Sequence, residues 1–120
     1  MTTAPRFAIF ILLQATEAWL RLPRSERNAL AASHVAGSLA NYPGLRMRYF
    51  DAEAFSASCS DLMLIETDDL TPYYDFMERL RDSPMIAAPY FKVVQIIPAI
   101  EEGFRAFEAR LASGQHRKCS

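Results

Sequence analysis

The chain has 120 residues, 51% hydrophobic and 22% charged, which fits one globular domain with its own core and excludes general disorder. Its 13 basic and 14 acidic residues are interspersed and give a net charge of −1. No basic stripe forms, so we expect no nucleic-acid partner. Two cysteines, Cys59 and Cys119, provide no disulfide framework and no metal-ligand spacing, and both are predicted to be free thiols in a reducing compartment.

The first element is a continuously apolar run over residues 7–13 (FAIFILL). Arg6 before it and QATEA after it imitate a signal peptide, but the run has the minimum length of a signal core and is rich in Phe and Ile. We interpret it as a strand covered on both faces. No apolar run approaches membrane-spanning length, so the sequence predicts a cytoplasmic protein without a membrane partner.

A connection over residues 15–22 holds Trp19, which is expected either to close one end of the core or to stand at a pocket rim or an interface. A helix is predicted over residues 24–41, because Pro23 suits its start and Pro43-Gly44 its end. On a period of 3.6 residues, one face of this helix carries Ala32, Val35, Ala36, Leu39 and Tyr42.

Strands are predicted over residues 45–51 and 61–67, joined by a small-residue loop into a hairpin. Alternation places Arg46, Arg48 and Phe50 on one face of the first strand and Tyr49 on the other. An amphipathic helix follows, capped at residues 68–69 and ending near residues 82–84, with Tyr74 on the flank of its apolar stripe.

In the C-terminal part, the sequence predicts a loop over residues 85–89, a strand over residues 90–97 that Pro98 ends, and a last helix. The apolar stripe of that helix contains Ile100, Phe104, Phe107 and Leu111. We expect one domain over residues 1–112 and a disordered polar tail over residues 113–120.

The predicted fold is α+β, a ferredoxin-like β-α-β-β-α-β arrangement with a four-stranded antiparallel sheet and a C-terminal helix. Three of the four strands carry apolar residues on both faces, whereas two helices cover only one face of a sheet. We therefore expect a homodimer in which two sheets share their uncovered faces, as a dimeric α+β barrel.

Three stretches carry a family resemblance: RMRYFDAEAFSASCSDLMLIETDDL at residues 46–70, YYDFMERLRDSP at residues 73–84 and PYFKVVQIIPAIEEGF at residues 89–104. In these stretches the chain resembles the darcynin family of small bacterial proteins, and the likeness extends over about residues 7–108. That family has no established activity, so the resemblance implies a ferredoxin-like sheet and no catalytic residues. A weaker fold-level likeness to dimeric α+β barrel proteins, among them monooxygenases, mutarotases and haem-degrading enzymes, is analogy only.

Two arginines and one histidine are candidates for site chemistry. Arg46 and Arg48 can hold a carboxylate or phosphate if their strand face looks into a cavity. The alternative is that they protect an edge strand, or pair with Glu66 and Asp61 on the next strand. His34, on the flank of the first helix, is a weak candidate for an acid or base, and more often such a histidine is a boundary residue.

No phosphate loop, nucleophile elbow or metal motif occurs, and we expect no cofactor and no metal. Cys59 lacks a neighbouring cation and is predicted to be inert. The leading hypothesis is a homodimer that binds a small molecule between sheet and helices, through His34, Arg48, Tyr49 and Tyr74, with Arg46 and Trp19 as further candidate ligand contacts. The alternatives are a cofactor-independent enzyme of dimeric-barrel type that uses His34 and an arginine, and a structural protein without a pocket.

Overall fold

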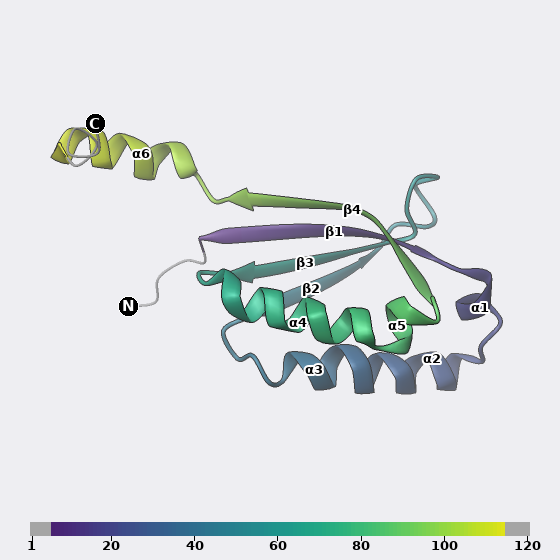
Figure 1. Cartoon of the computed structure of the whole chain (residues 1–120). Coiled ribbons are helices and arrows are strands. Elements are labelled where there is room, and N and C mark those ends of the chain that lie inside the picture. Colours follow the sequence, from purple (N-terminus) through teal and green to yellow (C-terminus); the bar gives the residue numbers. More distant parts are fainter. Residues whose placement is uncertain (1–5, 115–120) are drawn as a thin grey trace.

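One antiparallel sheet organises the structure, a computed structural model that describes residues 6–114 (Figure 1). Its strands are β1 (Phe7–Ala15), β2 (Arg46–Asp51), β3 (Asp61–Thr67) and β4 (Phe91–Ile100), in the order β2-β3-β1-β4. This order is that of the split β-α-β fold and confirms the predicted ferredoxin-like α+β architecture. β2 and β3 form the predicted hairpin, and β2 lies at an edge.

The longer helices of the two crossovers gather on one side of the sheet (Figure 1). The first crossover holds α1 (Glu17–Leu20), α2 (Arg24–Ala31), a π-helical turn η1 (Ala32–Ala36) and α3 (Gly37–Leu39). The second holds α4 (Leu70–Asp82) and α5 (Pro84–Ala87), and α6 (Gly103–Ser113) follows β4. The Asp69 side chain accepts a hydrogen bond of 3.0 Å from the backbone N–H of Thr71, which confirms the predicted cap of α4.

The core lies between the sheet and α4. Alternate residues of β1 and β3 point toward the helices and are buried: Ile9, Ile11, Leu13, Met63 and Ile65. The stripe of α4 packs on them through Phe76, Met77 and Leu80. Strand and helix periodicities therefore meet in one cluster, as the sequence predicts.

Two predicted boundaries are wrong. β4 runs through Pro98 to Ile100, because β4 is an edge strand with a backbone paired on one side only, where a proline is tolerated. The predicted loop over residues 85–89 contains most of α5, whose first turn is capped by the Ser83 hydroxyl, which accepts from the N–H of Met85 at 3.2 Å. Of the predicted tail, Ser113 ends α6 and Gly114 caps it, whereas residues 115–120, with Cys119, lie outside the described residues.

The face of the sheet opposite the helices has no covering layer in the described chain (Figure 1). α6 projects from the end of β4, away from the sheet and the other helices, and none of its residues is buried. The radius of gyration is 17.6 Å, whereas a compact domain of this length has about 13–14 Å. Within residues 6–114, no helix has the length and apolar character needed to cross a membrane.

Candidate functional site

A cavity of about 540 Å³ lies between the first crossover and the helix-facing side of the sheet. It exists because the α2–η1 segment presents small side chains, those of Ala31, Ala32 and Ala36, where larger ones would fill the gap. The volume falls in the range of small-molecule sites. The hollow opens to solvent beside Arg24 and Asn28.

Part of the cavity wall is apolar and aromatic. It is formed by side chains from both crossovers and from the sheet: Trp19, Val35, Leu39, Met47, Met85 and Phe91. The Trp19 ring lies 4.8 Å from the ring of Phe91 and 5.6 Å from that of Tyr90, centroid to centroid. Trp19 thus packs against the end of the core and also lies in the wall of the cavity.

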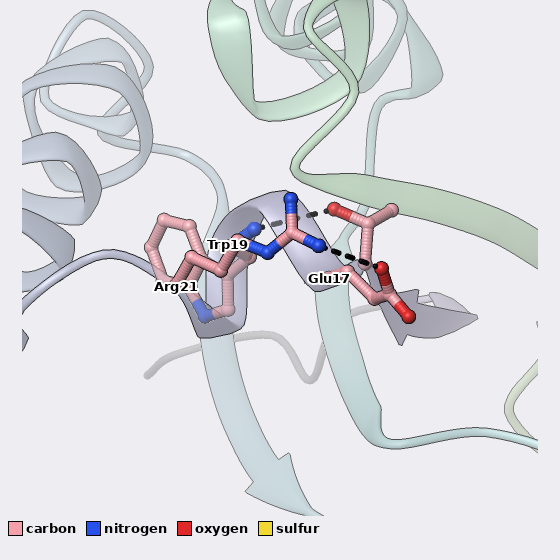
Figure 2. A network of polar contacts seen from close by, with 4 residues as sticks. Glu17, Trp19 and Arg21 are labelled. Atoms are coloured by element: carbon pink, nitrogen blue, oxygen red, sulfur yellow. Dashed lines mark hydrogen bonds and ion pairs between the residues drawn. The ribbon is translucent and has the colours of Figure 1, made fainter.

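The short helix α1 fixes Trp19 in this position (Figure 2). The Thr16 hydroxyl accepts a hydrogen bond of 3.3 Å from the backbone N–H of Trp19, and Arg21 pairs with Glu17 at 3.2 Å. The same hydroxyl donates to the carbonyl of Pro89 at 2.8 Å, which ties α1 to the segment before β4. This local network holds the indole against the rings of the second crossover.

The cavity wall also carries hydrogen-bonded acids from the β2–β3 hairpin. Tyr49 and Asp51 point to the helix side of β2, and the hairpin register sets Asp51 directly opposite Asp61. Asp61 is 8% exposed and accepts a hydrogen bond of 2.6 Å from the hydroxyl of Ser60. That hydroxyl oxygen accepts in turn from the backbone N–H of Ala15 at 2.7 Å, which joins the acid to β1.

In this cluster the pKa values of the Tyr49 phenol and the Asp61 carboxyl are both raised. Burial raises the pKa of Asp61, the hydroxyl of Ser60 lowers it, and a hydrogen bond to the carboxylate of Asp51 raises it again. Burial, followed by the negative charge of Asp61 and the hydrogen bond to it, raises the pKa of the Tyr49 phenol far above its ordinary value. The cluster is therefore a donor–acceptor group that favours the protonated forms of Tyr49 and Asp61.

The basic side chains of the wall come from α2. The Arg27 guanidinium donates to the carbonyls of Leu22 at 3.0 Å and Leu20 at 2.7 Å, and so holds the turn that leads into α2. Arg24 is exposed at the mouth. The opening of the cavity therefore carries charged side chains, whereas the part of the wall around Trp19 and Phe91 is apolar.

The residues predicted to form one pocket do not meet. Tyr49 and Trp19 line the cavity, but Arg46 and Arg48 lie on the opposite face of β2, because successive strand residues alternate. Arg48 pairs with Glu66 at 3.4 Å, both on the outer face. Asp61, the other predicted partner of the arginines, points to the helix side instead.

The two remaining candidates lie elsewhere. His34, in η1, is half-buried and outside the cavity wall, and Tyr74 is exposed on α4. Cys59 is a buried free thiol near Ser60, in line with its predicted inertness.

Sequence reasoning missed Asp51 and Asp61 as a pair. The signal was available, because counting the hairpin outward from its loop sets the last residue of β2 against the first residue of β3. It also missed the run of alanines on the inner face of the first helix, which predicts a gap when the facing strand residues are not large.

Metal or haem ligands are not gathered here. Within residues 6–114, no group of three or more His, Cys, Asp or Glu side chains is placed to hold a metal ion. The cavity wall contains neither histidine nor cysteine, the most common protein ligands of haem iron.

Comparison with solved structures defines the class of protein. A chlorite dismutase variant from Candidatus Nitrospira defluvii matches with a TM-score of 0.70 at 15% identity over 83% of this chain and 42% of that one. The dimeric chlorite dismutase from Nitrobacter winogradskyi matches with a TM-score of 0.63 at 19% identity, over 83% of this chain and 58% of that one. The chain thus has the ferredoxin-like α+β fold of these proteins and spans about half of their length.

Sequence comparison identifies the family. The model described as "Darcynin, domain of unknown function" matches residues 1–113. Darcynin from Chromobacterium violaceum is 55% identical over 61% of this chain and 92% of its own length. Darcynin 1 from Acinetobacter baumannii is 38% identical over 75% of this chain and 100% of its own length. The chain belongs to the darcynin family, as its sequence resemblance indicates.

Proposed function

We propose that this protein binds a small, largely apolar molecule in the cavity beneath α2 and η1, and that it does so as a homodimer. The carrying observation is the cavity itself, about 540 Å³, whose wall contains both aromatic side chains and the Tyr49–Asp61 group. Sites for small molecules combine an apolar lining with few well-placed polar groups in this way.

The polar part of the wall defines the complementary group on the ligand. Asp51 and Asp61 offer carboxyl oxygens that accept hydrogen bonds, so an amine, amide or hydroxyl donor fits there. The ring of Trp19 in the same cavity wall offers a flat apolar surface for an aromatic or aliphatic body. The expected ligand is thus amphipathic, with its donor group directed at the hairpin.

Native mass spectrometry of freshly purified protein tests the proposal. A retained small molecule is expected, and its occupancy should fall at least tenfold in Tyr49→Phe/Asp61→Ala protein, which lacks the polar part of the wall. Tyr74→Phe and Arg48→Ala are matched controls, because both side chains lie outside the cavity, and they should keep full occupancy. Unchanged occupancy in the double variant, or loss in the controls, would place the ligand elsewhere.

The homodimer is supported by the uncovered face of the sheet. Apolar side chains of that face, among them Phe10, Phe50 and Ile97, are more than a third exposed. Exposed apolar side chains gathered on one face are typical of protein–protein interaction sites. The chlorite dismutase from Nitrobacter winogradskyi, which shares the fold, is described as dimeric. Light scattering should give twice the chain mass, and a monomer at micromolar concentration would refute the dimer.

One observation favours a second candidate function, acid–base catalysis without a cofactor. A phenol and a carboxyl with raised pKa values, in contact at a cavity wall, are the kind of group that moves protons in enzymes. Once the ligand is identified, Asp61→Asn separates the two functions. An enzyme would keep binding and lose turnover, whereas a binding protein would show no turnover in either form.

A further inference from the structure

The end of β4 and α6 form a C-terminal arm, here defined as residues 96–113. Its strand part pairs with β1 as far as Ile100, and α6 beyond it projects away from the sheet (Figure 1). Every residue of β4 after Phe91 is exposed, although the neighbouring strand β1 is largely buried toward the helices. The reason is that α4 and α5 cover the sheet only as far as Phe91, so that Ile96 and Ile100 have no layer above them.

Two large apolar side chains of α6 are exposed on one face of the arm. Phe104 and Leu111 of α6 are 58% and 45% exposed. They recur at helical spacing on one face, as core-facing residues do. A helix of this length is marginal in water when it does not pack against another surface. The stripe therefore indicates that α6 packs against a surface that is not part of the arm.

The direction of the arm is built into the backbone. Glu102, between β4 and α6, has φ 43° and ψ 45°, the left-handed region that a side chain disfavours. Its carboxylate accepts a hydrogen bond of 2.8 Å from Arg105, which holds this conformation. At the far end Gly114, with φ 79°, closes the last turn of α6. The arm is thus a shaped element with its own caps.

The area of the uncovered sheet face points to what the arm contacts. Four strands about 4.8 Å apart, each rising about 3.3 Å per residue, give this face a footprint of roughly 400–500 Å². A stable interface takes about 800 Å² from each partner. If each copy packs α6 on the other, two surfaces add to the interface area of each copy. These are its own apolar stripe and the surface that receives the partner's stripe, together roughly 300 Å². Sheet face and exchanged arms reach the usual size together, and neither does alone.

We infer that the C-terminal arm is exchanged in the dimer, so that the apolar stripe of α6 packs on a second copy of this chain and not on its own. This inference rests on the proposed homodimer and makes it more specific. In a two-fold dimer the exchange is reciprocal, and both stripes are covered at once. It gives the exposed half of β4 and the left-handed turn at Glu102 a common role, which is to carry α6 across to the partner.

Sedimentation of the full-length chain tests the dimer contact. Phe104→Asp/Leu111→Asp should raise the dimer dissociation constant at least 100-fold. Phe55→Asp is the matched control, because Phe55 is 92% exposed in the β2–β3 loop at the far end of the sheet, and its dissociation constant should not change (Figure 1). A wild-type dissociation constant in the arm variant would overturn the inference. If Phe10→Asp dissociates the dimer and Phe104→Asp/Leu111→Asp does not, the homodimer stands and the exchange is refuted.

Cross-linking shows which copy the arm touches, without depending on a variant that weakens the dimer. A photo-reactive benzoylphenylalanine replaces Phe104, and ¹⁴N and ¹⁵N protein are mixed until the subunits have redistributed. Exchange predicts that about half of the cross-linked peptides join a light and a heavy chain. Peptides of uniform mass only would mean that α6 folds back on its own chain, and would overturn the inference. A wild-type monomer would refute the dimer and the exchange together.

Discussion

Filling the cavity should stabilise the protein and abolish ligand retention, because the hollow arises from small side chains on α2 and η1. Ala31 is half-buried and lines the cavity, so Ala31→Leu places three further carbon atoms inside it. At about 0.8 kcal/mol per buried CH₂ the full gain would be roughly 2.4 kcal/mol. The cavity opens to solvent beside Arg24 and Asn28, so we expect about half of that, about 1 kcal/mol.

A gain of this size corresponds to a rise in Tm of about 3–5 °C for a chain of this length. Thermal unfolding followed by circular dichroism measures it, and native mass spectrometry of the same sample measures the retained ligand. Ala29→Leu is the matched control, since Ala29 lies on α2, is exposed and is not in the cavity wall. It should change neither quantity.

The pairing of the two results is what distinguishes a filled site from a damaged one. A damaged fold loses stability and ligand together, whereas a filled cavity gains the first and loses the second. If Ala31→Leu lowers Tm by several degrees, the hollow is already closed by rearranged side chains, and the reasoning from alanine size fails. If it raises Tm and retention is unchanged, the ligand binds at another place.

Three further predictions concern the hairpin. Ser60→Ala should lower the unfolding free energy by about 2 kcal/mol in urea titrations, because it removes a buried hydroxyl that serves both Ala15 and Asp61; a loss below 0.5 kcal/mol would contradict this. Arg48→Ala should cost less than about 0.5 kcal/mol by the same measurement, since its ion pair with Glu66 is exposed, and a larger loss would show a second contact. Asp61→Asn should remove part of the pH dependence of stability. Because the pKa of Asp61 is raised in the folded state, its carboxyl stabilises the fold in acid, and this contribution is lost as pH rises through the folded-state pKa. The unfolding free energy of the variant should therefore increase relative to that of the wild type toward pH 7. A difference in unfolding free energy that is the same at pH 3 and pH 7 would refute this.

Strong local signals made much of the fold predictable. β3 matches its predicted bounds, and α4 begins where Asp69 caps it, because caps and hydrophobic period agree there. The strand through Pro98 was not predictable from propensity, since a proline ends most strands and only its place at the sheet edge permits it. Edge position is a property of topology, which no short segment contains.

The candidate site was less predictable than the fold. The prediction that joined Arg48 and Tyr49 in one pocket conflicts with strand alternation, which sends neighbouring residues to opposite faces. Alternation alone therefore excludes Arg48 from a site under the helices. The cavity itself depends on how far α2 stands from the sheet, and periodicity tells which residues face inward but not whether they fill the space.

The two faces of the β2–β3 hairpin have different roles. Its helix side carries Tyr49 and the facing acids to the cavity, and its outer side carries Arg48 and Glu66 to the surface proposed for the dimer. A shift of register by one residue would move the side chains of each face to the opposite face of the sheet. The register that pairs Asp51 with Asp61 therefore keeps both sets of side chains in place. Since the proposals use opposite faces of one sheet, ligand retention and dimer mass are expected to respond to separate variants. A single substitution under the helices that changed both would mean that the cavity and the dimer surface are coupled through the sheet.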